Sequence, residues 1–341
     1  MTLVLLLALL GPPTAGGGNA PLLEKGQQLF RQGDVAGALA AFDAAAKADP
    51  KDARAHYLRG VALEKKGDSG EALAAYRLAV ARKADFPEAQ NNLGALLSAK
   101  GEQAAAAVAF TAAIKARPDY PEAHYNLGVA KDALGKNAEA VTAYTEAVRL
   151  KPGDAGYRLN LGAALRRVGD VEGAWGAFQD ATHLAPKDPM AWANLGMVLS
   201  DKKSYDAAYD ALSRAVKLKA DFALGWNRLG RVELKRGKVD AAVDAQKRAR
   251  KLEPKNAAFA ADLCRAFFEK KDAAHAVSEC QAAVQLDPQN ALGRYELGKA
   301  LVAKKDCAGA RAEFARFSAL PGIKPEAKAQ ADAIAASCGA K

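Results

Sequence analysis

The sequence predicts an all-α fold, a solenoid of about nine helix–turn–helix repeats that ends in a capping helix. Counted from Asn19 in windows of 34 residues, position 8 is glycine in eight of nine windows and position 20 is alanine in all nine. Position 24 is mostly aromatic and position 32 mostly proline. Small residues let two helices cross closely, and the bulky residue fills the space beside them. Such hairpins bury their apolar faces only against one another, so the period predicts a stack.

The windows, called repeats one to nine, are residues 19–52, 53–86, 87–120, 121–154, 155–188, 189–222, 223–256, 257–290 and 291–324. Repeat four shows why each is a pair of helices. Its Pro121 suits a first helical turn, where the missing N–H costs nothing. Gly135 ends the first helix, because glycine takes the left-handed conformation without strain. Pro152 stops the second helix. Residues 325–341 follow as one more helix, expected to cover the apolar end of repeat nine.

The period and these positions resemble the tetratricopeptide repeat (TPR) family, and the resemblance covers residues 21–324. It implies a right-handed superhelix of helix pairs that serves as a non-catalytic scaffold for protein–protein interaction.

Residues 1–20 differ from the repeats. An apolar run, Leu3 to Leu10, precedes Gly, Pro and small residues, as in a secretory signal peptide cut after Ala15 or Ala20. The usual positive start is absent. The run is too short to cross a bilayer, so no transmembrane span is expected. We expect an exported protein of the periplasm or cell envelope, with a disordered cytosolic leader as the alternative.

The four cysteines lie in the last quarter of the chain. Cys264 and Cys280 take positions 8 and 24 of repeat eight, which face each other within a hairpin. Cys307 begins the second helix of repeat nine, and Cys338 lies near the end of the capping helix. Of the three possible pairings, the register favours 264–280 and 307–338. Four buried free thiols are the alternative.

Some repeats depart from the pattern. Lys131 and Glu233 take position 11, which is otherwise apolar, and Gln246 takes the usually aromatic position 24. We expect Glu233 and Gln246 to hydrogen-bond to each other. The turn glycine is replaced by lysine in three repeats, where slight backbone strain is expected: Lys203, Lys271 and Lys305.

Catalytic and metal-binding patterns are not found in the sequence. The four histidines are far apart, no pair of cysteines has C-x-x-C spacing, and no phosphate-binding glycine loop is present. His56 and His124, both at position 4, are expected to be packing residues. We therefore expect no enzyme, no metal and no cofactor. The net charge is +10, but no Lys/Arg run exceeds three residues, so a solvated basic surface is favoured over nucleic-acid binding.

Position 6 of repeats three to six is occupied by four asparagines: Asn92, Asn126, Asn160 and Asn194. We expect them on the concave surface, one helix-packing distance (about 10 Å) apart. A carboxamide both donates and accepts, so it can pair with the backbone of an extended peptide. The row is similar to the asparagine ladder of the O-linked N-acetylglucosamine transferases, whose catalytic domain has no counterpart here. A row of solvated helix residues is the alternative.

Beyond repeat six the expected inner surface becomes basic. Arg228 takes position 6, and the other cations take positions 9 and 13: Arg231, Lys235, Arg265 and Lys299. An acidic segment is therefore expected to meet repeats seven to nine. The carboxylate clamp of the TPR family needs lysine at position 2, which is absent from the asparagine repeats, so this clamp is not predicted.

These observations predict a scaffold that binds an extended segment of a partner protein in its concave groove. One alternative is an assembly subunit of an envelope machine that uses its convex face and ends. The other is a cytosolic regulatory adaptor. The partner and the oligomeric state do not follow from the sequence.

Overall fold

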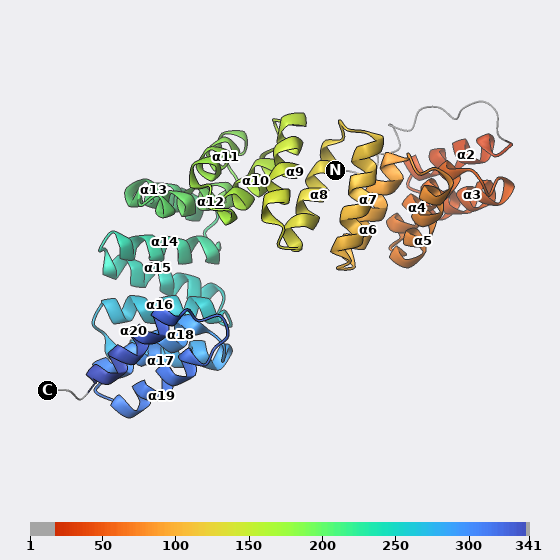
Figure 1. Cartoon of the computed structure of the whole chain (residues 1–341). Helices are drawn as coiled ribbons and strands as arrows, with labels where there is room; N and C mark the ends of the chain where they lie inside the picture. Colours follow the sequence, from red (N-terminus) through yellow and green to blue (C-terminus); the bar gives the residue numbers. More distant parts are fainter. Residues whose placement is uncertain (1–17, 339–341) are drawn as a thin grey trace. The chain divides into compact units, whose positions relative to one another are not determined.

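The computed structural model describes residues 18–338, and within them it contains nineteen helices and no strand (Figure 1). The all-α repeat fold expected from the sequence is confirmed. The proposed leader lies outside the described residues, apart from its last three positions. The chain forms two compact units, Met1–Val168 and Gly169–Lys341. They are called the N-terminal and the C-terminal unit, and the division falls between the two helices of repeat five.

In the N-terminal unit the helices are α2 (Ala20–Arg31), α3 (Val35–Ala48), α4 (Ala53–Lys66), α5 (Ser69–Arg82), α6 (Pro87–Ala99), α7 (Gln103–Ala116), α8 (Pro121–Ala133), α9 (Asn137–Leu150) and α10 (Ala155–Arg167). In the C-terminal unit they are α11 (Val171–Leu184), α12 (Pro189–Asp201), α13 (Tyr205–Leu218), α14 (Ala223–Lys235), α15 (Val239–Leu252), α16 (Ala257–Glu269), α17 (Ala273–Leu286), α18 (Ala291–Ala303), α19 (Cys307–Ser318) and α20 (Pro325–Ser337). Even-numbered helices up to α18 are the first helices of the repeats, and odd-numbered helices are the second.

The two helices of a repeat pack through a glycine and a large side chain. A Cβ atom added to Gly128 would lie 2.6 Å from the ring of Tyr144, and one added to Gly26 would lie 2.4 Å from the ring of Phe42. Tyr144 and Phe42 are fully buried, as is Ala140 at position 20. Glycine at position 8 is therefore required by the close approach of the two helices, as the sequence pattern indicates.

The turn between the two helices has a left-handed residue at position 15. Gly135 has φ 72°, and the three substituting lysines have φ of 61° to 63°. A side chain at such a φ is unfavourable. The strain expected at Lys203, Lys271 and Lys305 is thus present in the backbone geometry.

Position 4 of the first helix holds the loop that precedes it. In seven repeats a side chain at this position lies 2.7–3.2 Å from the main-chain oxygen six residues earlier, at position 32 of the preceding repeat. The contacts satisfy a carbonyl that follows the end of a helix, where no helical partner exists. They explain His56 and His124, whose Nε2 atoms take part. The seven residues are His56, Gln90, His124, Arg158, Trp192, Trp226 and Arg294.

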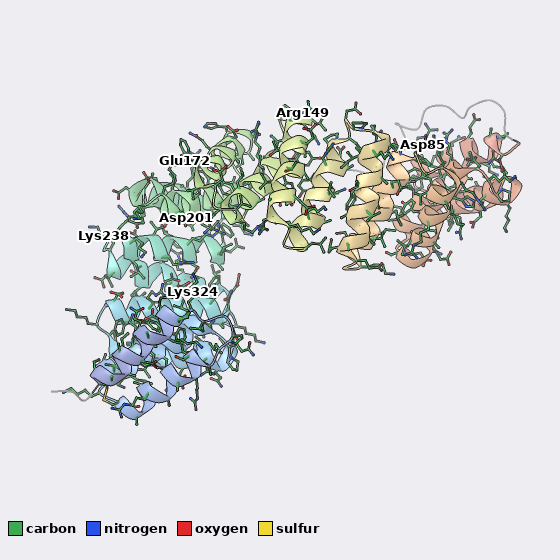
Figure 2. The ribbon with its side chains drawn as sticks, viewed as in Figure 1. Asp85, Arg149, Glu172, Asp201, Lys238 and Lys324 are labelled. Carbon is green, nitrogen blue, oxygen red and sulfur yellow. A yellow bond between two sulfur atoms is a disulfide. The ribbon has the colours of Figure 1, made fainter. Side chains whose placement is uncertain are left out.

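Ion pairs join neighbouring repeats in the C-terminal unit. Lys202 Nζ lies 2.5 Å from a carboxylate oxygen of Glu172, the α11 residue labelled in Figure 2. The equivalent pairs, one repeat and two repeats further on, are Arg236–Asp206 and Lys270–Asp240, both at 2.8 Å. All three acids are exposed, so each pair is worth about 1 kcal/mol or less.

Two disulfides lie at the C-terminal end of the chain, in the expected pairing. Cys264 and Cys280 join α16 to α17, with sulfurs 1.99 Å apart, and their side chains occupy the place of the glycine–aromatic pair. Cys307 and Cys338 join the start of α19 to the residue after α20. Helix α20 packs against α18 and α19 and covers the end of repeat nine, as expected of a cap.

Candidate functional site: a polar row and a basic pocket on the first helices

The position-6 asparagines of the N-terminal unit bond to the preceding repeat. Asn126 Nδ2 donates to Asn91 Oδ1 at 3.0 Å. Asn160 Nδ2 donates to the Tyr125 hydroxyl at 3.1 Å and to the main-chain oxygen of Gly156 at 3.0 Å. Asn91 and Tyr125 both occupy position 5, so one geometry recurs at a spacing of 35 residues. The period of the sequence indicates the asparagines but not their position-5 partners.

Asn92 uses the same geometry with tyrosines. Its Nδ2 lies 3.3 Å from the Tyr76 hydroxyl and 3.5 Å from the Tyr57 hydroxyl. Burial raises the pKa of both tyrosines well above the usual range. Both hydroxyls therefore stay protonated at physiological pH and accept through their lone pairs.

In Asn126 and Asn160 these contacts leave the carbonyl side of the amide unused, whereas Asn92 Oδ1 accepts from Asn91 Nδ2 at 3.5 Å. All three asparagines are half-buried, and their Nδ2 donors face the preceding repeat. Among the described residues, none donates a hydrogen bond to Oδ1 of Asn126 or Asn160. A carbonyl oxygen accepts up to two hydrogen bonds. The row therefore consists of oriented acceptors, where the sequence had suggested groups that both donate and accept freely.

Asn194 in the C-terminal unit has a different partner. Its Oδ1 accepts from Arg228 Nη1 at 2.9 Å, so position 6 of repeat six bonds to position 6 of repeat seven. Both residues are half-buried. Each is therefore already engaged on the first helices α12 and α14.

A pocket of about 380 Å³ brings together three of the predicted cations. It lies among α14, the turn to α15, and α16, and Arg231, Lys235 and Arg265 line it together with Leu234, Gly237, Val239 and Glu269. This group is called the basic pocket. Arg231 and Lys235 are exposed, whereas Arg265 is half-buried.

Lys299 does not line this pocket. Its Nζ lies 2.8 Å from Glu296 Oε2 and 4.3 Å from the centre of the Phe268 ring. Arg265 Nε approaches the other oxygen of the same carboxylate at 2.8 Å. The Glu296 side chain is only 2% exposed, so its charge is buried and needs both cations.

A buried polar network replaces the aromatic core of repeat seven. Gln246 is fully buried; its Oε1 accepts from Asn227 Nδ2 at 2.9 Å, and its Nε2 donates to the Asn227 main-chain oxygen at 3.0 Å. Asn227 Nδ2 also donates to Asp262 of the next repeat at 2.9 Å. The expected Glu233–Gln246 bond is wrong, because Glu233 pairs with Arg236 at 2.9 Å. Asn227 lies one helical turn before Gly230, against which Gln246 packs, and so comes within reach.

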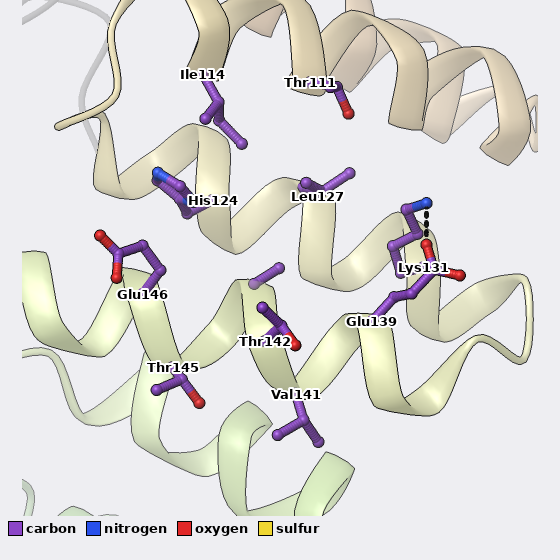
Figure 3. A pocket seen from close by; sticks show the side chains of 11 residues that line it. Thr111, Ile114, His124, Leu127, Lys131, Glu139, Val141, Thr142, Thr145 and Glu146 are labelled. Atoms are coloured by element: carbon purple, nitrogen blue, oxygen red, sulfur yellow. Dashed lines mark hydrogen bonds and ion pairs between the residues drawn. The ribbon is translucent and has the colours of Figure 1, made fainter.

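A second cavity, of about 820 Å³, opens among α7, α8 and α9. Lys131 lines it where most repeats have leucine, and the lysine turns to an ion pair with Glu139 at one end (Figure 3). The hydrogen bond from Lys131 lowers the pKa of Glu139. His124 and Glu146 lie at the other end. The departure at position 11 thus places a lysine in the wall of this cavity.

Other classes of site are not found in the described part of the chain. No group of three or more His, Cys, Asp or Glu residues between 18 and 338 is placed to hold a metal ion. No helix in that range is long and apolar enough to cross a membrane.

A sequence profile of the tetratricopeptide repeat family matches residues 23–88, 91–155, 159–221 and 227–291. The matched segments make up well over half of the chain. The chain belongs to the tetratricopeptide repeat family. The search of curated protein sequences found no match.

Solved TPR structures share the fold. A TPR protein from Parabacteroides merdae is 17% identical, with a TM-score of 0.62 over 73% of this chain and 98% of its own. The match to the Cut9–Hcn1 hetero-tetramer of APC/C has 21% sequence identity and a TM-score of 0.58, and it covers 83% of this chain and 56% of the other. The match to PilF of Pseudomonas aeruginosa has 20% sequence identity and a TM-score of 0.52, and it covers 61% of this chain and 95% of PilF. At these identities the likeness shows the fold alone.

Proposed function

We propose that this TPR protein is an exported scaffold that holds an extended segment of a partner protein across the first helices of its repeats. The observation that carries the proposal is the row of asparagines at position 6. In Asn126 and Asn160 the Nδ2 group is fixed by the preceding repeat, and no residue between 18 and 338 donates a hydrogen bond to Oδ1. Fixed acceptors bind with less loss of side-chain entropy than mobile ones.

The spacing of the row suits extended polypeptide. Neighbouring first helices pack about 10 Å apart. A strand rises about 3.3 Å per residue, so neighbouring asparagine oxygens stand about three residues of an extended segment apart. Recognition of the main chain selects conformation and leaves side-chain preference to the rest of the groove.

The two disulfides support export. Disulfides persist in oxidising compartments and are rare in the cytosol. Both lie in the last repeats, where α20 closes the stack. The cytosolic adaptor is therefore the less favoured alternative.

Cross-linking and pull-down from the native compartment test the binding proposal. Asn126→Ala removes an oxygen proposed to contact the partner, together with one bond between repeats. Asn91→Ala removes the same bond from its other end and leaves the Asn126 oxygen in place. Both variants should lose roughly 0.5–1.5 kcal/mol of stability. Only Asn126→Ala should also weaken capture of the partner.

Equal capture by both variants, with each folded by circular dichroism, contradicts the groove. The assembly subunit that uses its convex face and ends then becomes the better description.

A further inference from the structure

The basic pocket holds cations that the fold does not use. Of the four arginines on α14, α16 and α18, only Arg231 has no hydrogen bond, ion pair or ring contact with the described residues. Lys235, one turn further along α14, has no such contact within residues 18–338 either. Both line the pocket. Their charges contribute nothing evident to the stability of the repeats.

The third cation is held in position from outside the pocket. Arg265 is tied through Nε to the buried Glu296 carboxylate, which Lys299 shares. The remaining nitrogens of its guanidinium make no hydrogen bond to the part of the chain that the structure describes. Arg265 thus combines a fixed anchor with free donors, while Arg231 approaches from the neighbouring helix.

The rest of the lining is partly apolar. Leu234 and Val239 contribute aliphatic surface, and Gly237 adds none beyond its backbone. The volume of about 380 Å³ equals that of roughly a dozen waters in the liquid. This is room for one long amino-acid side chain and some solvent.

We propose that the basic pocket binds a carboxylate carried on a short aliphatic stem, supplied by an acidic residue of the partner segment. The inference rests on the proposed function and names the chemistry of one subsite within it. The guanidinium forks of Arg231 and Arg265 match the two oxygens of a carboxylate. Methylene groups of the stem then lie against Leu234 and Val239.

A carboxylate fits better than a phosphate group. Glu269 lines the same pocket, and its charge repels a dianion about twice as strongly as a monoanion. The site also differs from the carboxylate clamp of the TPR family, which uses positions 2 and 6. Here the cations stand at positions 9 and 13.

The test uses two synthetic extended peptides, acetylated and amidated, that alternate serine with glutamate or with glutamine. Affinity is measured by fluorescence anisotropy at low and at high salt on the full chain. The glutamate peptide should bind more tightly, and the difference should shrink with salt. Arg231→Gln should weaken its binding about tenfold or more and leave the glutamine peptide unchanged.

Arg311→Gln is the matched control. Arg311 is exposed on α19 and makes no hydrogen bond, ion pair or ring contact within the described residues. Its substitution changes the net charge by the same amount as Arg231→Gln. It should alter both affinities by less than about twofold. Equal losses in Arg231→Gln and Arg311→Gln, or no preference for the glutamate peptide, overturn the subsite.

Competition separates the sources of the anion. A glutamine peptide with a free C-terminus that binds like the glutamate peptide, and loses affinity in Arg231→Gln, assigns the pocket to a terminal carboxylate. Displacement by inorganic phosphate at lower concentration than by glutarate overturns the assignment to carboxylate. Asn126→Ala tests the groove of the N-terminal unit and Arg231→Gln tests the pocket of the C-terminal unit, so failure of the groove is distinguishable from failure of the pocket.

Discussion

Helix α20 should depend on the Cys307–Cys338 disulfide for its position. Ala331 is the only fully buried residue within the helix, and Cys338 directly after it is 5% exposed. Ala327, Ile334 and Ala335 are only partly buried against the same core, so the apolar area that holds α20 on α18 and α19 is limited. The disulfide closes a loop across a separation of 31 residues, worth about 4 kcal/mol in the chain-entropy model.

The perturbation is the double variant Cys307→Ala, Cys338→Ala, and the assay is amide hydrogen exchange followed by mass spectrometry. Loss of about 4 kcal/mol corresponds to about a thousandfold faster exchange, provided that α20 opens by itself. Repeat proteins couple mainly to their nearest neighbours, so α12 to α15 should keep their protection.

The double variant Cys264→Ala, Cys280→Ala is the control. This pair closes a separation of 16 residues, worth about 3 kcal/mol, and its loss should act on α16 and α17 first. Unchanged exchange of α20 in the Cys307/Cys338 variant refutes the reasoning, because the helix would then be held by its side-chain contacts alone.

Other substitutions test the packing of single repeats by thermal or urea unfolding. Gly128→Ala should destabilise by about 1–3 kcal/mol, since its Cβ would lie 2.6 Å from Tyr144; no loss would show that the helices separate at little cost. Lys131→Leu should stabilise by about 1–2 kcal/mol, because leucine gives the wall of the α7–α9 cavity an apolar side chain and the pair it removes is weak on the exposed Glu139 side; a loss would mean that the Glu139 pair matters more. Lys203→Gly should stabilise by up to about 1 kcal/mol, since φ is 61°, and Gly135→Lys should act in the opposite direction; equal signs would contradict the strain.

The helix pairs and the cysteine pairing follow from the sequence because they depend on residues close in the chain or at fixed positions of the period. Gly128 and Tyr144 lie within one hairpin, as do Cys264 and Cys280. Because the same pattern recurs in nine windows, an irregular residue in one repeat does not obscure where its helices and turn lie. Even the three lysines with left-handed backbone could be identified, because they take position 15 of the repeat, where other repeats have the turn glycine.

Contacts between repeats were decided only by the tertiary structure. The partners of Asn126 and Asn160 lie 35 residues earlier, at position 5 of the preceding repeat. Gln246 forms its hydrogen bonds with Asn227 instead of Glu233. The basic pocket likewise needs α14 and α16 to be placed side by side before Arg231 and Arg265 line one cavity. The sequence period determines which residue types recur along each helix. Which polar atoms meet depends on the rotation and offset between neighbouring repeats, and these are set by the packing of all their side chains together.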